Sequence, residues 1–517
     1  MFTRKSIIRK TMQVGGWTLV SRFLGIVREL LTVRYIGASA VSDAFITAWK
    51  IPNSLRKIFA EGALSAAFVP SIVQTVRAEG RQAINGLMSL GFLVFEGVVL
   101  LLSMIGMLYA NDVIALIAPG FSAEQVATGG QFLYILMPFI FLISTSALLA
   151  GPLQAVGHFF VPAVGPVLLN SIYIAGLIIC LSFKLPITAL CWFIMAGGVV
   201  QLIAHIVAYI RLHFGFGRIT QRDLQKFGWV LVRFVPCLLS MSVMELGLFI
   251  DTSFASLLSK GSVSLIYYAN RFMGIPLGVF AVALSTILLP HFSRVSSYAP
   301  RRLGFYLLEA TKLVWWVTVP IAITMMLLSQ KIFITLFLSD KFSFAQAQEA
   351  GTILTASLLG LFFFAINKIL LNVYYSVHHT VIPAVIAVGS VMTNIFLNWL
   401  FIDYLQAVGL ALATTIAAAL QTLFLYGILH YYLNMQLYVP QLLQFIARYA
   451  LQMGILGAGF VGIYWIIASI LEALALTFFV QSLGFWIWVS PLCVLFMGAL
   501  YLTRSWFGVR ILFLEQD

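Results

Sequence analysis

Apolar windows of about 20 residues, separated by short polar or Pro/Gly-containing breaks, recur along the whole chain. An α-helix needs a window of this length to cross the hydrocarbon core of a bilayer. With 62% apolar residues, 9% charged residues and a mean hydropathy of +1.02, a soluble chain is excluded. The sequence therefore predicts an all-α polytopic membrane protein with about fourteen helices. The expected spans are residues 14–36, 43–76, 84–110, 128–150, 160–183, 187–212, 229–258, 264–294, 305–329, 350–376, 382–402, 408–432, 445–470 and 480–503.

The distribution of Lys and Arg predicts the orientation of these helices. The formal net charge is +13, but the basic residues are spread over short loops and helix ends, so topology explains them better than nucleic-acid binding. If the N-terminus is cytoplasmic, the inside loops and the C-terminus hold Arg77, Arg81, Arg211, Arg218, Arg222, Lys226, Arg294, Arg301, Arg302, Arg504 and Arg510. The outside loops then hold Lys184, Lys260, Lys331 and Lys341 among several acids. An even number of helices places both termini in the cytoplasm.

Four short matches, each offset by 220 to 224 residues, indicate an internal repeat. They pair residues 37–52 with 261–276, 63–70 with 283–290, 158–164 with 379–385, and 190–201 with 410–421. The first copy carries four additional residues between its first two matches, in the charged stretch NSLRKIFAEG. Each copy spans six helices, an even number, so both enter the membrane in the same direction and form a parallel repeat typical of rocker-type transporters. The predicted organisation is two pseudo-symmetric lobes, residues 1–226 and 227–438, followed by two extra helices in residues 439–517.

The stretch from Ser21 to Pro70 is unusually charged for a membrane region. In a helix over residues 14–36, Arg22 and Arg28 lie only about 4–5 Å along the axis from the midpoint, too deep to reach an interface readily. Arg22 and Glu29 share a face, so one interpretation is an internal salt bridge that locks the bundle. Cations still outnumber acids: Arg22, Arg28, Arg34, Lys50, Arg56 and Lys57 stand against Glu29, Asp43 and Glu61, of which Lys57 and Glu61 are spaced as an i,i+4 pair. A low-dielectric cavity retains surplus cations only if an anion meets them.

The second lobe also places polar and charged side chains in apolar spans. They are Glu245, Asp251, Asn270, Arg271, Lys312 and Lys368. Pro276, which follows Arg271, is the repeat counterpart of Pro52, so we expect Arg271 to face Arg56 across a central cleft. Because a planar guanidinium binds two phosphate oxygens, the predicted ligand is anionic and phosphorylated.

No catalytic signature is present: the sequence contains no P-loop, HExxH or GxSxG motif. The four cysteines lie in apolar runs without metal or redox spacing. We therefore expect a transporter rather than an enzyme, with no cofactor and no metal site, and with the coupling ion left open.

The motifs SRFLGIVREL, SDAFITAWKIPNSLRKIFAEGALSAAFVP and YYANRFMGIPLGVFAVALSTILLP closely resemble the MurJ (MviN) family of lipid II flippases, within the MOP exporter superfamily. The resemblance covers the whole chain. It implies a central cationic cavity that takes the diphosphate and the sugar–peptide head group of lipid II. It also implies that the last two helices form a groove for the polyprenyl tail. The net reaction would move the peptidoglycan precursor from the cytoplasmic to the periplasmic leaflet of the bacterial inner membrane by alternating access.

The resemblance assigns roles to individual residues. Family positions carry over to Arg22, Arg28, Asp43, Arg56 and Arg271. The arginines are expected to bind the substrate, whereas Arg22–Glu29 and Asp43 would form gate-linked pairs. Two departures affect the charge balance. Glu29 stands where Asp is common in the family, and Asn270 and Gly274 stand where some members carry acids, so Glu245 could supply the missing carboxylate.

Alternative functions remain open from the sequence. The chain could flip another lipid-linked oligosaccharide, or it could be a multidrug or cation antiporter of the same superfamily, although a cationic cleft argues against the antiporter. A third interpretation is a membrane scaffold for wall-synthesis or division enzymes. The expected partners are lipid II and membrane lipids, and the two lobes could work as a monomer.

Overall fold

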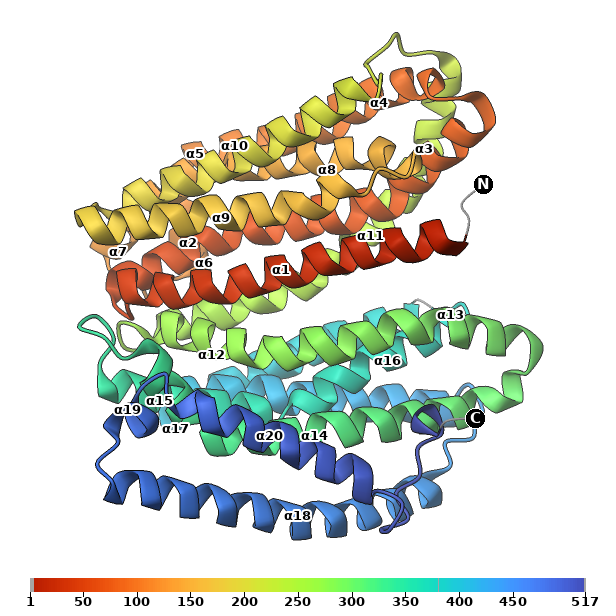
Figure 1. The fold of residues 1–517 in the computed structure, drawn as a ribbon. Helices are drawn as coiled ribbons and strands as arrows, with labels where there is room; N and C mark the ends of the chain where they lie inside the picture. Colours follow the sequence, from red (N-terminus) through yellow and green to blue (C-terminus); the bar gives the residue numbers. More distant parts are fainter. Residues whose placement is uncertain (1–3, 380, 516–517) are drawn as a thin grey trace. The chain divides into compact units, whose positions relative to one another are not determined.

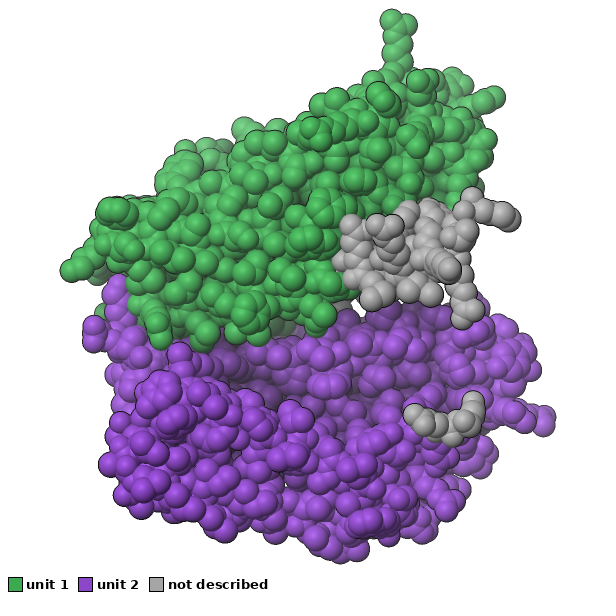
Figure 2. All heavy atoms as spheres, viewed as in Figure 1, with its two compact units in different colours: residues 1–264 green, residues 265–517 purple. Residues whose placement is uncertain are grey.

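The computed structural model describes residues 4–379 and 381–515; within them the side chains of residues 4–14, 61–63, 65–66, 239–240 and 243–244 are not described. The described chain is helical almost throughout, and its only β pairing is an isolated bridge between Ser339 and Phe342. Its contacts divide it into two compact units, Met1–Ser264 and Leu265–Asp517, which are coloured separately in Figure 2; Figure 1 shows the helices of each. The all-α prediction is confirmed.

Unit 1 contains eleven α-helices, with three short π- or 3₁₀-helical segments between them. In chain order they are α1 (Arg4–Ile36), α2 (Ala40–Arg56), η1 (Lys57–Leu64), α3 (Ser65–Glu79), η2 (Gln82–Ile84), α4 (Asn85–Gly91), η3 (Phe92–Glu96), α5 (Gly97–Leu108), α6 (Ala110–Ile117), α7 (Ala123–Leu136), α8 (Phe139–Ala155), α9 (Phe160–Phe183), α10 (Ile187–Arg211) and α11 (Gln221–Ser256). Helix α9 packs against both α1 and α10 (Figure 1).

Unit 2 begins at Leu265, inside helix α12, so the first three residues of α12 belong to unit 1. Its elements are α12 (Ser262–Pro276), η4 (Leu277–Ala281), α13 (Val282–Tyr298), η5 (Pro300–Arg302), α14 (Leu303–Phe337), α15 (Phe344–Leu358), α16 (Leu361–Ser376), α17 (Val381–Tyr431), α18 (Val439–Ala473), α19 (Thr477–Gln481), α20 (Phe485–Thr503) and η6 (Leu512–Leu514). The last two long helices, α18 and α20, pack on each other and on α14 (Figure 1).

Within the described residues, nine helices are long and apolar enough to cross a membrane, or ten if α15 and α16, bent by 41° at their junction, form one span. Helix α17 is 51 residues long and breaks at Gln406, whose φ of 48° and ψ of −132° are not helical. The expected spans 382–402 and 408–432 lie on either side of this break. The protein is therefore a multi-pass membrane protein, and the count of fourteen helices stays a prediction.

Left-handed backbone conformations recur at equivalent places in the two copies of the repeat. Positive φ angles are found in the pairs Gly37 and Gly261, Gly157 and His378, Lys184 and Gln406, and His213 and Asn434. The second member of each pair follows the first by 224, 221, 222 and 221 residues, respectively. Capping boxes also match, since Ser122 with Gln125 and Ser343 with Gln346 both begin helices. The chain thus turns at the same points in both copies, as the parallel repeat predicts.

The two proline-kinked helices are also equivalent. In the first copy, α2 contains Pro52 and continues through the π-helical segment η1 into α3. In the second copy, α12 ends at Pro276 and continues through the π-helical segment η4 into α13. The π segment is eight residues long in the first copy and five in the second, and it falls where the first copy carries its additional residues. Such local widening is frequent at functional sites, and here it adjoins Arg56 and Lys57.

Each unit buries its own apolar core. In unit 1, Phe68, Phe95, Leu148 and Val230 are among the buried residues that join α3, η3, α8 and α11. Helix α11 therefore belongs by packing to unit 1, although the repeat makes it the first helix of the second copy. Packing and repeat divide the chain differently, and the lobe boundaries after residues 226 and 438 remain a prediction about the repeat.

Candidate functional site

Arg28 on α1 is held by three side chains of unit 1. Its Nη1 donates to Oδ1 of Asn170 on α9 at 2.9 Å, and its Nη2 donates to Oε1 of Glu29 at 2.7 Å. The guanidinium carbon lies 5.1 Å from the ring centroid of Tyr173, also on α9, within the range of a cation–π contact. Asn170 is itself fixed, because its Nδ2 donates to the backbone oxygen and the hydroxyl of Ser21 at 3.2 and 3.3 Å. The arginine is thus oriented before any ligand arrives.

The ion pair of Glu29 differs from the prediction. We expected Arg22 as its partner because the two residues share a helix face, but Glu29 pairs with Arg28. The reason lies in α9, which packs along α1 and draws the guanidinium of Arg28 toward Asn170, within reach of Glu29. Arg22 lies on an exposed face of α1 instead. The Arg28 and Glu29 side chains are each only 14% exposed, so this pair is poorly screened by solvent.

Helix α2 and the π-helical segment η1 carry three further cations. Arg56 is half-buried, and its Nε and Nη2 donate to Oδ1 of Asn53 one turn earlier at 3.3 and 3.2 Å. Lys50 donates to the hydroxyl of Thr252 on α11 at 2.8 Å. Lys57, the first residue of η1, pairs with Glu245 on α11 at 3.0 Å. Basic residues of α2 and η1 therefore bind polar groups of α11.

The sequence predicts an ion pair for Lys57, but the partner found in the structure, Glu245, is not the predicted one. The side chain of Glu61, its expected i,i+4 partner, lies outside the described residues, so that pair stays a prediction. Glu245 was expected to complement Arg271, whereas the structure gives it Lys57 as a partner. No sequence signal could have shown this contact, because the two residues are 188 positions apart and meet only through the packing of α11 on η1.

Asp43, in the first turn of α2, binds the N-terminal turn of α12. Its Oδ2 accepts from the backbone N–H of Gly261 at 2.6 Å, and its Oδ1 accepts from the N–H and the hydroxyl of Ser264 at 2.8 and 2.6 Å. The Ser264 hydroxyl also lies 3.0 Å from that of Ser42. A carboxylate at the start of a helix satisfies N–H groups that have no partner in the helix and complements the helix dipole. Asp43 is only 2% exposed, so the contact is sealed from water.

The fourth predicted substrate residue, Arg271, belongs to unit 2. It is exposed on α12, where its Nε and Nη2 donate to the hydroxyl of Tyr267 at 3.1 and 2.7 Å. Its guanidinium carbon lies 5.0 Å from the centroid of the same ring. Asn270 and Gly274 on this helix are exposed as well. Tyr267 therefore orients Arg271 much as Tyr173 orients Arg28, and its i−4 spacing is the sequence signal for this arrangement.

A buried carboxylate in unit 1 was missed by the sequence reasoning. Glu96 in η3 is 1% exposed and accepts from the hydroxyls of Ser144 and Thr145 on α8 at 2.8 and 3.0 Å. Within the part of the chain that the structure describes, no group of three His, Cys, Asp or Glu side chains is arranged to hold a metal ion. Within each unit taken by itself, neighbouring side chains orient guanidinium groups, which are suited to phosphate oxygens.

Solved structures with this fold are membrane transporters. A multidrug resistance MATE family transporter of the MOP superfamily, in an inward-facing conformation, matches with a TM-score of 0.67 over 80% of this chain and 98% of its own, at 14% identity, which shows the fold alone. A structure described as lipid II flippase MurJ, inward closed conformation, matches with a TM-score of 0.76 over 95% of this chain and 99% of its own, at 26% identity. The fold is thus one that this chain shares with polytopic membrane transporters.

Sequence comparisons identify the family within this class. The family model for lipid II flippase MurJ matches residues 32–485. The lipid II flippase MurJ of Burkholderia cenocepacia is 32% identical over 429 residues, covering 81% of this chain and 83% of the relative. The probable lipid II flippase MurJ of Buchnera aphidicola from Acyrthosiphon pisum is 32% identical over 432 residues, covering 80% of this chain and 82% of the relative. The chain belongs to the MurJ family of lipid II flippases.

Proposed function

We propose that this protein flips lipid II, the undecaprenyl-diphosphate-linked peptidoglycan precursor, from the cytoplasmic to the periplasmic leaflet of the bacterial inner membrane. The observation that carries the proposal is the set of oriented arginines in a chain whose relatives are named lipid II flippases. Deep arginines suit a diphosphate, because they supply paired donors and charge where the bilayer provides neither. A carrier of cationic drugs would instead need unpaired carboxylates.

Arg28, Arg56 and Arg271 would clamp the diphosphate. Each is oriented by a neighbour within its own unit, namely Asn170 and Tyr173, Asn53, or Tyr267, so little side-chain entropy is lost on binding. Glu29 would hold Arg28 until the substrate phosphate replaces its carboxylate. Arg22, exposed on the same helix, would add a further positive charge near the entering head group.

Alternating access would depend on the Asp43 contact. Asp43 ties the start of α2 to the start of α12, at the end of these helices that the Lys and Arg distribution places outside. While the contact holds, the outer end would be closed and the substrate would enter from the cytoplasm. Breaking it would free the first turn of α12 and let the outer end open. Lys57 with Glu245, and with Glu61, would act as charge pairs that form and break during the same movement.

The proposed orientation follows the bias of Lys and Arg, with both termini in the cytoplasm and helices α18 and α20 providing a groove for the lipid tail. The protein would act as a monomer, with lipid II and membrane lipids as its partners, and wall-synthesis or division enzymes could dock on lipid-facing surfaces. The process would be transport without covalent change to the substrate.

The arginine roles are tested in vesicles that contain the purified protein and fluorescent lipid II. Arg28→Ala, Arg56→Ala and Arg271→Ala should each lower the flipping rate roughly 10- to 100-fold, the range expected from losing a charge-assisted hydrogen bond at about 1.5–3 kcal/mol. Arg28→Lys should recover only part of the loss because a lysine lacks the two-pronged geometry. Arg34→Ala, on the exposed face near the end of α1, is the matched control. A wild-type rate in Arg28→Ala would refute the clamp.

A further inference from the structure

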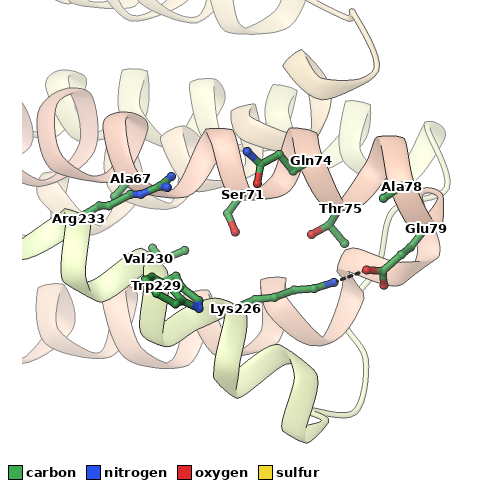
Figure 3. A pocket seen from close by; sticks show the side chains of 10 residues that line it. All are labelled: Ala67, Ser71, Gln74, Thr75, Ala78, Glu79, Lys226, Trp229, Val230 and Arg233. Carbon is green, nitrogen blue, oxygen red and sulfur yellow. Dashed lines mark hydrogen bonds and ion pairs between the residues drawn. The ribbon is translucent and has the colours of Figure 1, made fainter.

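A groove between α3 and α11 in unit 1 lies apart from the arginines assigned above. It has a volume of about 460 Å³, within the range of small-molecule binding sites. Figure 3 shows its walls: Ser71, Gln74, Thr75 and Glu79 come from α3, whereas Lys226, Trp229 and Arg233 come from α11. Helix α3 ends, and α11 begins, near basic loops that the Lys and Arg distribution places in the cytoplasm. The groove therefore opens at the membrane surface on that side.

The residues that line the groove include two cations, Lys226 and Arg233, but one acid, Glu79. Among the ten described residues that line it, Figure 3 marks a single polar contact, the ion pair of 2.7 Å between Lys226 and Glu79. The guanidinium of Arg233 extends beside α3 and bonds to none of the other nine. Arg233 lies one turn beyond Trp229 on α11, in the apolar run that precedes Pro236. A guanidinium with no partner among the groove residues, next to an apolar run, calls for water or an anion.

The opposite wall supplies hydroxyl donors. Ser71 and Thr75 are one helical turn apart on α3, so they share a face, and both hydroxyls point toward α11 in Figure 3. Lys226 and Arg233 are two turns apart on α11 and likewise share a face. Hydroxyl donors opposite a guanidinium and an ammonium form a site for phosphate oxygens. The half-exposed Lys226–Glu79 pair is worth at most about 1 kcal/mol, so Lys226 remains available to a phosphate.

The remaining wall indicates that the phosphate is attached to a lipid. Trp229, which lies between Lys226 and Arg233 in the sequence, also lines the groove, and its side chain is 69% exposed. An indole with one apolar and one polar edge is typical of the membrane–water interface. Val232, 67% exposed on the neighbouring face of α11, extends the apolar surface toward the acyl region. A soluble phosphate would gain nothing from these apolar contacts.

We propose that the α3–α11 groove binds the phosphate of a lipid head group at the cytoplasmic membrane surface, with Arg233, Lys226, Ser71 and Thr75 as its ligands. The lipid is either lipid II on its way to Arg28 and Arg56, or an anionic phospholipid of the bilayer. The inference rests on the proposed function for its orientation in the membrane, and its ligand residues are separate from the proposed clamp.

Site-specific crosslinking tests the groove. A photoreactive phenylalanine replaces Ala78, an exposed lining residue, in the full-length protein in nanodiscs. Three tagged probes are compared: a lipid II analogue, phosphatidylglycerol and inorganic pyrophosphate. Arg233→Gln should lower the crosslinking yield of a lipid probe at least fivefold. Arg222→Gln, an exposed arginine on the same helix outside the groove, should leave the yield unchanged. Thr75→Val, which preserves shape and removes the hydroxyl, should give a smaller loss.

The probes separate the possible sources. If Arg233→Gln lowers the crosslinking yield of the lipid II analogue alone, the groove binds lipid II. If it lowers the yield of phosphatidylglycerol equally, the groove binds phospholipids of the bilayer. Unchanged yields for both lipids in folded Arg233→Gln would overturn the proposal, as would crosslinking by pyrophosphate alone. Arg28→Ala should leave crosslinking at Ala78 intact while it lowers the flipping rate. If flipping survives Arg28→Ala but crosslinking requires Arg233, the clamp fails and the groove stands.

Discussion

At the residue scale, the site depends on neutral side chains that orient charged ones. Asn170 and Tyr173 hold Arg28, and Tyr267 holds Arg271. An arginine with a fixed guanidinium pays less conformational entropy when it binds phosphate than a freely rotating one. The contacts of Arg28 with Tyr173 and of Arg271 with Tyr267 are weak, because a cation–π contact is worth only about 0.5–2 kcal/mol. They therefore orient the arginines without preventing substrate release.

The Asp43 contact gives a stability prediction. Asp43→Ala leaves the N–H groups of Gly261 and Ser264 without their acceptor, and each buried unsatisfied donor costs about 1–3 kcal/mol. We expect a clear drop in the unfolding temperature of the purified protein. Ser264→Ala should cost less, because the backbone N–H still reaches the carboxylate. Asp403→Asn, at an exposed position on α17, is the control and should have no effect. Equal unfolding temperatures for Asp43→Ala and wild type would refute the contact.

The sequence singled out candidate site residues but did not predict their partners. The depth of Arg22 and Arg28 in an apolar segment was sufficient to single them out. Glu29 pairs with Arg28 rather than with Arg22 because of the register between α1 and α9. The helical periodicity of α1 alone does not reveal this register. The Lys57–Glu245 pair likewise depends on how α11 packs on η1. Partners come from tertiary contacts, whereas the place of a charged residue within an apolar run can be read from local sequence.

At the element scale, the repeat sets the shape of the helices. Pro52 and Pro276 each precede a π-helical segment, so the kink is built into both copies. Proline removes a backbone donor and crowds the preceding turn, while the wider π turn absorbs inserted residues. The matching prolines were readable from the sequence. The π segments were not, because they arise from hydrogen-bond register.

Close helix packing in unit 2 gives a second stability prediction. A Cβ added to Gly351 on α15 would lie 2.9 Å from the Cα of Gln330 on α14, so Gly351→Ala should force the two helices apart. Overpacking of this kind costs about 1–3 kcal/mol. Gly389→Ala on α17, with no atom within 4 Å of the added Cβ, should be neutral or slightly stabilising. Thermal unfolding of the two variants side by side measures the difference. Equal stability would contradict the packing of α14 on α15.

At the scale of the whole molecule, hydropathy predicted the fold class and the offset matches predicted the repeat. Lys184 and Gln406, at equivalent places in the two copies, both have a positive φ angle. The repeat could be predicted because breaks between helices depend on the local sequence, which is similar in the two copies. The division into units was less accessible, because α11 begins the second copy but packs in the first unit.

The proposed topology predicts the accessibility of single cysteines. In a variant whose four native cysteines are replaced by alanine, Lys260→Cys should react with a membrane-impermeant maleimide added to intact spheroplasts. Arg301→Cys should react only after the membrane is permeabilised. Both positions are exposed, so labelling reports the side of the membrane rather than burial. The reverse pattern would invert the orientation and place the Asp43 contact at the cytoplasmic end.

Complementation tests the central claim most directly. This protein is produced in a bacterium depleted of its own lipid II flippase, and lipid II is quantified in each leaflet of the inner membrane. The proposed function predicts restored growth and restored lipid II in the periplasmic leaflet, with Arg28→Ala inserted normally but inactive. A well-expressed, membrane-inserted protein that leaves lipid II in the cytoplasmic leaflet would contradict the assignment of lipid II as its substrate.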